Sequence, residues 1–395
     1  MVIAQSGGPT MVINESVVGA VLRAKRSKHV TRILGARHGI RGILDRDFID
    51  LGRESERTLE AVRKTPSSAL GSVRHKPTPD ECREVAHIFQ KYNVRYFFYI
   101  GGNDTAEAAH IVTEECRRSH HDFECFHIPK TVDNDLRQND HTPGYPSAAR
   151  FIAQAFQGDN LDNRALGGVK IDVLMGRHAG FLTAASALGR KHEDDGPHLI
   201  YLPERPFSMT GFVRDVDRVY KKRGRCIVAV SEGIVDGMGD LIAAKHATER
   251  DAHGNVTLGG SGALGDLLAR IVKETTDTAR VRADTFGYMQ RSFHGVRSAV
   301  DEREAFAVGA KAVEFALRGE PSGSVAIKRV AGSRYRVELR RVSLGSVAKH
   351  ARSMPSSFIA KSGTDITPAF LKYAKPLVGP LPRMGRLREI VVKGL

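Results

Sequence analysis

Residues 129–135 read Pro-Lys-Thr-Val-Asp-Asn-Asp and place a cation, a hydroxyl and two carboxylates directly after an apolar, strand-like run. A helix N-cap accounts for Thr131 and Asp133, but it does not explain why Lys130 lies beside two acids. Phosphoryl transfer to an alcohol needs such a set. A carboxylate accepts the hydroxyl proton, and a cation offsets the negative charge on the phosphoryl oxygens. The spacing therefore indicates a phosphoryl-transfer site.

Two Gly-Gly loops point to the same chemistry. Residues 6–9 read Ser-Gly-Gly-Pro, and residues 101–105 read Gly-Gly-Asn-Asp-Thr. Glycine lets the backbone approach an oxyanion closely, and the helix that follows offers unpaired N–H groups. For either loop alone an ordinary tight turn is the simpler interpretation. Neither loop matches a Walker A motif or the full dinucleotide fingerprint, so the pair favours phosphate binding and not a dinucleotide.

A strand–loop–helix alternation must position these loops. Short β-branched and aromatic runs predict strands at residues 2–4, 94–100, 123–128, 171–174 and 227–230, and helical patterns cover 12–26, 106–118 and 179–188. This alternation predicts an α/β fold with a mostly parallel sheet, helices on both faces and ligands at the carboxyl ends of the strands. Residues 324–330 and 334–342 predict an antiparallel hairpin instead.

The composition excludes several classes of protein. The chain has 395 residues, of which 41% are hydrophobic, so it can form substantial cores and is not expected to be disordered. No apolar run approaches the roughly 20 residues of a membrane span. The first residues lack the basic region of a secretory signal. Four scattered cysteines without a Cys-x-x-Cys pair argue against a zinc ribbon or a disulfide framework, and they fit a reducing, cytoplasmic location.

The positive charge is concentrated toward the end of the chain. The net charge is +15, and residues 328–395 carry 15 Lys and Arg against three acidic residues. Such a surface could bind nucleic acid, an anionic membrane or phosphorylated small molecules, or it could be solvated or contact another subunit. An aromatic content of 7% and the lack of a recognised binding motif argue against nucleic acid.

Taken in order, the motifs resemble the 6-phosphofructokinases, and within them the pyrophosphate-dependent branch. The resemblance covers about residues 1–315 and rests on six motifs: 7–9, 101–105, 129–135, Met-Gly-Arg at 175–177, Ser-Glu-Gly at 231–233 and Gly-Tyr-Met-Gln-Arg at 287–291. It implies reversible phosphoryl transfer from pyrophosphate to the C1 hydroxyl of fructose 6-phosphate, giving fructose 1,6-bisphosphate and phosphate. Residues 346–395 match none of these motifs.

The resemblance implies a role for each motif residue. Asp133 would accept the proton of the C1 hydroxyl, while Thr131 and Asp135 would help to hold the sugar and the transferring group. Pyrophosphate would be bound by Gly8, Gly102 and Lys130. The sugar phosphate would be bound by Thr131, Asp133, Met175, Gly176, Arg177, Glu232, Tyr288 and Arg291, and by Arg282 from a neighbouring subunit.

Two positions govern the expected phosphoryl donor. Family members that use ATP typically carry glycine where this chain has Asp104 and Lys130. An aspartate puts volume and negative charge where the α-phosphate of ATP would lie. A lysine supplies charge to a donor that lacks a nucleotide. Both residues therefore favour pyrophosphate, and we count Asp104 with Asp133 and Lys130 as candidate catalytic residues.

Three positions need separate comment. Asn103 stands where the family commonly has a magnesium-ligating aspartate, and an amide oxygen can still bind Mg²⁺, which remains the expected cofactor. Gly168 stands where a cross-subunit arginine is expected, so Lys170 could substitute, or Arg282 and Arg291 could bind the 6-phosphate. Glu204 lies near an effector position of regulated relatives.

The expected architecture is two Rossmann-like lobes with mostly parallel sheets and an active-site cleft between them. Residues 1–140 with about 292–345 would bind pyrophosphate, residues 141–291 would bind fructose 6-phosphate, and the basic segment 346–395 has no assigned role. A cross-subunit Arg282 implies a homodimer or homotetramer, and neither nucleic acid nor a membrane is an expected partner.

Four alternatives remain open from the sequence. These are an ATP-dependent phosphofructokinase, a sedoheptulose 7-phosphate kinase, a non-catalytic regulatory subunit and a nucleic-acid-binding protein. The motifs would bind the phosphate end of the sugar and say little about the length of the sugar, so a sedoheptulose 7-phosphate kinase remains open. The intact Asp133, Lys130, Glu232 and Arg291 argue against a non-catalytic subunit.

Overall fold

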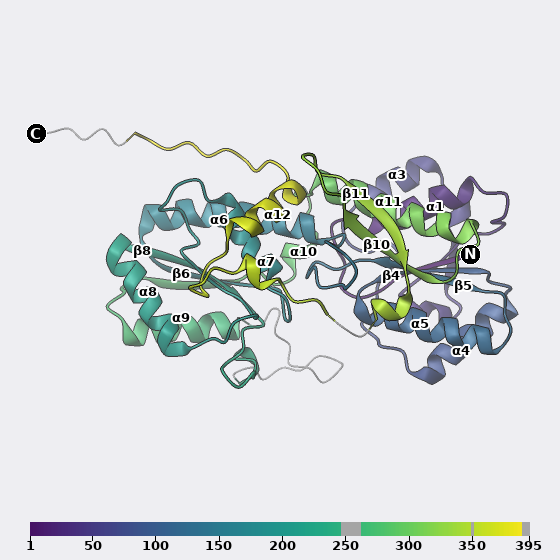
Figure 1. Cartoon of the computed structure of the whole chain (residues 1–395), viewed down its shortest axis with the longest axis horizontal. Helices are drawn as coiled ribbons and strands as arrows, with labels where there is room; N and C mark the ends of the chain where they lie inside the picture. Colours follow the sequence, from purple (N-terminus) through teal and green to yellow (C-terminus); the bar gives the residue numbers. More distant parts are fainter. Residues whose placement is uncertain (246–261, 349–350, 389–395) are drawn as a thin grey trace, which may run out of the picture.

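The computed structural model describes residues 1–245, 262–348 and 351–388, and it shows two α/β lobes side by side (Figure 1). Each lobe is built around its own sheet. The strands of the first sheet come from both ends of the sequence, whereas those of the second come from its middle. The expected two-lobed α/β fold with mostly parallel sheets is confirmed.

The first sheet has seven strands in the spatial order β11-β10-β5-β4-β1-β2-β3. Their bounds are β1 (Val2–Gln5), β2 (Leu34–Ala36), β3 (Phe48–Asp50), β4 (Tyr96–Gly101), β5 (Glu124–Pro129), β10 (Gly323–Arg329) and β11 (Val337–Val342). The central strands are parallel, and the edge strands β3 and β11 are antiparallel to their neighbours. Because β1, β4 and β5 are adjacent and parallel, the three loops that follow them lie together at one edge of the sheet.

Both faces of this sheet are covered by helices, as the alternation of side chains requires. On β4, Phe98 and Ile100 belong to the core shared with α1 (Ile13–Lys25) and α11 (Ala299–Leu317). The intervening Phe97 and Tyr99 belong to the core shared with α4 (Pro79–Lys91) and α5 (Asn103–Arg118). The period of two along a strand thus sends alternate side chains into two separate cores.

The second sheet is fully parallel, in the order β7-β8-β6-β9. Its strands are β6 (Gly168–Leu174), β7 (Leu199–Tyr201), β8 (Arg225–Ser231) and β9 (Val281–Thr285). One core joins it to α6 (Tyr145–Leu166), α7 (Phe181–Ala185) and α12 (Pro368–Val378), and another joins it to α8 (Met209–Arg223) and α9 (Ala263–Thr275). The shorter helices are α2 (Ile40–Leu44), α3 (Glu56–Lys64) and α10 (Met289–Ser292).

Most of the predicted elements are confirmed, with shifted boundaries. Helix α5 begins at Asn103 rather than at 106, β6 begins at Gly168 rather than at 171, and β10 with β11 forms the predicted hairpin. Helix α12 was not predicted, because its helical pattern is interrupted by Pro376 and lies in a region of weak periodicity. Among the residues described, no helix is long and apolar enough to cross a membrane. All four cysteines are buried and free.

Candidate active site

Lys130 joins the two Gly-Gly loops of the first lobe. Its backbone N–H donates to the carbonyl of Gly101 at 3.0 Å, which connects the end of β5 to the end of β4. Its Nζ lies 3.0 Å from the position that a Cβ on Gly7 would take, and Gly7 has a φ of 75°. Gly102 is the N-cap of α5, with its Cβ position 3.8 Å from the Lys130 carbonyl oxygen. The sequence prediction that these loops converge is confirmed.

The surroundings of Lys130 lower the pKa of its side chain. The side chain is 4% exposed, and burial lowers the pKa of Lys130 to about 8, with the positive charge of Arg291 acting in the same direction. The carboxylates of Asp133 and Asp135 act in the opposite direction, and the value of about 8 includes their effect. Lys130 therefore stays mostly protonated at neutral pH, and a bound polyanion would favour its charged form further.

Asp133 combines a buried oxygen with a raised pKa. Its backbone N–H donates to Thr131 Oγ1 at 3.1 Å, and its Oδ1 is buried and accepts no hydrogen bond from any residue the structure describes. Burial, and then the charges of Asp135 and Glu232, raise the pKa of Asp133 to about 7. Such a carboxylate can accept a proton near neutral pH.

Asn103, the first residue of α5, is hydrogen-bonded to Asp135 in the loop after β5. The Asn103 amide nitrogen donates to Asp135 Oδ2 at 3.2 Å, whereas Asn103 Oδ1 is buried and has no hydrogen-bond partner in the described part of the chain. Among all the residues that the structure describes, there is no cluster of three or more His, Cys, Asp or Glu side chains that could hold a metal ion. One amide and one carboxylate oxygen can therefore supply only part of a cation's ligands.

The second lobe contributes the loops after β6 and β8. Ser231 Oγ donates to the carbonyl of Gly176 at 2.6 Å, and a Cβ on Gly233 would lie 2.1 Å from the carbonyl oxygen of Arg177. The Met-Gly-Arg and Ser-Glu-Gly motifs are thus packed against each other. Burial raises the pKa of the adjacent Glu232 to about 7, and this carboxylate also raises the pKa of Asp133.

Gln290 joins the Gly-Tyr-Met-Gln-Arg motif to the Met-Gly-Arg motif. Its side-chain oxygen accepts from Met175 N at 3.2 Å, and its amide nitrogen donates to the carbonyl of Gly287 at 2.8 Å. Arg291 Cζ lies 4.2 Å from the centroid of the Tyr288 ring, within the range of a cation–π contact. The turn after β9 therefore holds a guanidinium and an aromatic ring beside the Met-Gly-Arg loop.

Arg74 belongs to this group of residues, and the sequence analysis did not identify it. Its Cζ lies 5.5 Å from the Tyr288 ring centroid, and after burial its charge is the largest cause of the lowered pKa of Arg291. Backbone pairing explains its place, because Gly7 N donates to the carbonyl of Val73 at 3.2 Å. The only signal in the sequence was a basic residue in a long stretch without periodicity.

Two predicted site residues lie outside this cluster. Asp104 is exposed in the first turn of α5. The pKa of Lys76 is raised mainly by the hydrogen bond that Lys76 donates to Glu107, and the charge of Asp104 adds to this effect. Arg282 is exposed on the edge strand β9 and donates to the carbonyl of Val281 at 3.0 Å. Lys170 faces Arg282 in the β-sheet register and pairs with Asp172 at 3.6 Å.

A buried carboxylate with a raised pKa, a buried lysine and glycine loops between two α/β lobes are the features of a phosphotransferase site. The chain belongs to the phosphofructokinase family, whose model, described as "Phosphofructokinase", matches residues 1–316.

Several characterised proteins and solved structures resemble the chain. It is 56% identical over 392 residues to the pyrophosphate–fructose 6-phosphate 1-phosphotransferase of Rhodospirillum rubrum, covering 98% of this chain and 96% of that protein. It is 32% identical over 361 residues to the sulfofructose kinase of Alkalicoccus urumqiensis, with 90% and 91% covered. The crystal structure of a pyrophosphate-dependent phosphofructokinase from Marinobacter aquaeolei matches with a TM-score of 0.85 and 32% identity, covering 100% of this chain and 97% of that one.

Proposed function

We propose that the protein transfers a phosphoryl group reversibly from pyrophosphate to the C1 hydroxyl of fructose 6-phosphate, giving fructose 1,6-bisphosphate and phosphate. One observation carries this proposal: Asp133 lies three residues after a lysine that touches both Gly-Gly loops, and its buried Oδ1 has no hydrogen-bond partner among the described residues. The likeness to the Rhodospirillum rubrum enzyme over almost the whole length supports the same reaction.

In the proposed mechanism Asp133 removes the proton of the C1 hydroxyl. The resulting oxygen attacks the nearer phosphorus of pyrophosphate in line, the bond from that phosphorus to the bridging oxygen breaks, and inorganic phosphate leaves. Lys130 and the backbone amides of residues 101–105 stabilise the negative charge that spreads over the transferring group. The raised pKa of Asp133 suits this proton transfer at neutral pH.

The second lobe would bind the sugar phosphate. Glu232 and the 175–177 loop would accept and donate hydrogen bonds to the sugar hydroxyls, and the Arg291 guanidinium would form a fork with the 6-phosphate beside Tyr288. Arg74 adds positive charge between the two phosphate groups. These assignments agree with the geometry, because the guanidinium carbons of Arg74 and Arg291 lie 5.5 Å and 4.2 Å from the centroid of the Tyr288 ring. Burial, and then the charge of Arg74, lower the pKa of Arg291.

Magnesium would enter with pyrophosphate. The buried Asn103 Oδ1 and the carboxylate of Asp135 are oxygen ligands of the type that Mg²⁺ prefers, and the phosphate oxygens and water would complete the set. When bound, the ion supplies positive charge to the pyrophosphate oxygens. A homodimer or homotetramer fits the exposed Arg282 on an edge strand, where a neighbouring subunit could receive it. We expect this oligomer to be cytoplasmic.

A comparison of donors in the wild type and in Asp133→Asn tests the proposal. With fructose 6-phosphate and Mg²⁺, pyrophosphate should support turnover and ATP should not, and Asp133→Asn should lower kcat by about 10³-fold. Asp122→Asn, at an exposed carboxylate of the same lobe, should behave as the wild type.

Each part of the proposal can fail separately. ATP used as well as pyrophosphate would contradict the donor assignment, and Asp133→Asn with most of its turnover would contradict the assigned base. A preference for sedoheptulose 7-phosphate over fructose 6-phosphate would contradict the assigned acceptor.

A further inference from the structure

The segment of residues 351–388 crosses from the first lobe to the second (Figure 1). It contacts the loop that carries Asp133. We call this segment the C-terminal segment and residues 131–144, between β5 and α6, the catalytic loop. The two meet at an isolated antiparallel bridge between Leu136 and Ala351. The C-terminal segment lies beyond residues 1–316, which match the family model.

The Arg352 side chain donates hydrogen bonds to three backbone carbonyls of the catalytic loop. Its guanidinium donates to the carbonyl of Asn134 at 2.8 Å, to that of Asn139 at 2.6 Å and to that of Asp140 at 3.3 Å. Its own backbone N–H donates to the carbonyl of Asp135 at 2.6 Å. One side chain thus joins the two ends of the turn that follows Asp133.

Tyr373, in α12, contacts the same turn. Its hydroxyl accepts from the Asn134 side-chain nitrogen at 2.7 Å and donates to the carbonyl of Asp140 at 2.8 Å. Asn134 is fully buried with a φ of 60°, a left-handed conformation that is uncommon outside glycine and that asparagine adopts more readily than most residues. Its side chain is held at the same time by the Tyr373 hydroxyl. Because Asn134 follows Asp133 directly, its backbone angles help to set where the Asp133 carboxylate points.

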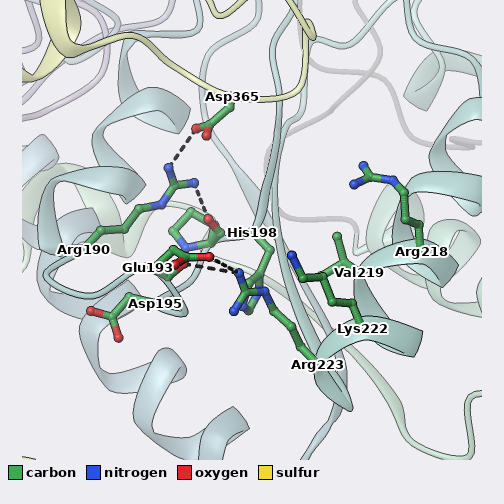
Figure 2. Close-up of a pocket in the computed structure, with 10 residues that line it drawn as sticks. Arg190, Glu193, Asp195, His198, Arg218, Val219, Lys222, Arg223 and Asp365 are labelled. Carbon is green, nitrogen blue, oxygen red and sulfur yellow. Dashed lines mark hydrogen bonds and ion pairs between the residues drawn. The ribbon is translucent and has the colours of Figure 1, made fainter.

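The C-terminal segment is itself anchored, so it can act as a fixed support. Arg329 donates to the Tyr373 carbonyl at 2.7 Å and stacks on its ring at 4.4 Å. Figure 2 shows Asp365 paired with Arg190 of the second lobe, at 2.8 Å. Glu204 accepts from Met354 N at 3.0 Å and so binds the same segment near its start.

Glu204 also joins the C-terminal segment to the sugar-binding side of the site. Besides Met354 N, its Oε1 accepts from Gly180 N at 2.8 Å, three residues after the Met-Gly-Arg motif. In this chain, the glutamate that lies near an effector position of regulated relatives therefore makes structural hydrogen bonds to two backbone amides.

We propose that Arg352 and Tyr373 are positioning residues for phosphoryl transfer, which hold Asn134 in its left-handed conformation so that the Asp133 carboxylate faces the acceptor hydroxyl. Neither side chain needs to touch substrate for this role. The inference rests on the proposed function, because it assumes that Asp133 is the base. It assigns a role to part of the basic C-terminal segment.

Two conservative variants and one control separate positioning from general stability. Tyr373→Phe removes the hydroxyl but keeps the ring packed on Phe358 and Phe370. Arg352→Lys keeps the charge but loses the planar fork that reaches several carbonyls. Each should lower kcat about tenfold or more, with the KM for pyrophosphate within about twofold of wild type, because the Gly-Gly loops are untouched. Lys372→Gln, at the exposed neighbour of Tyr373, should match the wild type.

A double-mutant cycle tests whether Tyr373 acts through Asp133. In an Asp133→Asn background, Tyr373→Phe should change the residual kcat by less than about twofold, because the base that it positions is gone. An equal loss in both backgrounds would overturn the proposal. So would wild-type kcat in both Tyr373→Phe and Arg352→Lys.

Hydrogen exchange provides a readout that does not depend on the reaction. Amides of residues 131–142 should exchange faster in Tyr373→Phe than in the wild type, while Lys372→Gln should leave them unchanged. Unchanged exchange in Tyr373→Phe would overturn the positioning role even if the enzyme is active. A wild type that forms no product from pyrophosphate and fructose 6-phosphate would instead contradict the proposed function.

Discussion

Nη1 of Arg291, in the second lobe, lies 2.9 Å from the position that a Cβ on Gly8 of the first lobe would occupy. A residue expected to bind the sugar phosphate is therefore in contact with a loop expected to bind the donor. In-line transfer requires the two phosphate-bearing substrates to meet. In the proposed mechanism, the Gly8–Arg291 contact would put that meeting point at the boundary between the lobes.

Gly8→Ala should displace the Arg291 guanidinium. Because the atom that the methyl would meet is the far end of a flexible side chain, the fold should tolerate the change while the phosphate site loses its geometry. We expect the KM for fructose 6-phosphate to rise about tenfold, as for a weakened charge-assisted contact. Steady-state kinetics and thermal unfolding would measure both effects.

The control for this variant is Gly158→Ala, at a helical position where no neighbouring atom lies within 4 Å of the added methyl. It should leave the kinetics unchanged. A Gly8→Ala enzyme with the wild-type KM for fructose 6-phosphate would show that the position of Arg291 does not matter for binding.

Arg74→Gln should weaken both substrates' binding. The charge of Arg74 lowers the pKa values of both Lys130 and Arg291, so Arg74 lies near the donor side and the sugar side of the site. We expect kcat/KM for each substrate to fall by about 10- to 100-fold, the range of a lost charge-assisted hydrogen bond. Arg83→Gln, at an exposed arginine of the same lobe, is the control. Unaltered kinetics for both substrates would remove Arg74 from the site.

The rate should depend on pH through Asp133. Burial and the charge of Asp135 raise its pKa to about 7, and only the deprotonated form can accept the hydroxyl proton. The kcat/KM should therefore fall about tenfold per pH unit below about pH 7 and level off above it. Asp135→Asn removes a charge that raises this pKa, so the fall in kcat/KM on the acidic side (the acidic limb of the profile) should move to lower pH.

A pH-rate profile of the wild type, of Asp135→Asn and of Asp133→Asn would check this. The residual rate of Asp133→Asn should lack the acidic limb that Asp133 causes. A wild-type profile that stays flat below pH 7, or an Asp135→Asn limb displaced to higher pH, would contradict the assignment.

Donor choice should respond to Asp104. The side chain is exposed in the first turn of α5, so Asp104→Gly should cost no more than about 1 kcal/mol of stability, from helix propensity and the lost interaction with the helix dipole. We expect kcat/KM for ATP to rise and that for pyrophosphate to change little.

Asp104→Asn separates charge from volume, because it removes the negative charge and keeps the size of the side chain. An increase in ATP use with Asp104→Gly alone would assign the effect to volume, and an increase with both would assign it to charge. If neither variant used ATP better than the wild type, Asp104 would not select the donor.

Local patterns in the sequence were sufficient to predict much of the candidate site. The Gly-Gly loops, Lys130 and Asp133 belong to short motifs at strand ends, and a parallel sheet brings its strand ends to one edge. Arg74 has no motif, and it is placed by the backbone hydrogen bond from Gly7 to its neighbour Val73. Helix α12 escaped prediction because Pro376 interrupts its pattern, and packing on α6 supports it instead.

The sequence by itself determined which chemical groups the protein brings to its strand ends: a lysine, carboxylates and glycine loops suited to phosphate. The tertiary structure alone decided how those groups are tuned and held. Burial sets the pKa of Asp133, and burial depends on the packing of both lobes. The contact between Asn134 and Tyr373 joins residues 239 positions apart, a distance at which no local propensity acts and only the folded chain brings side chains together.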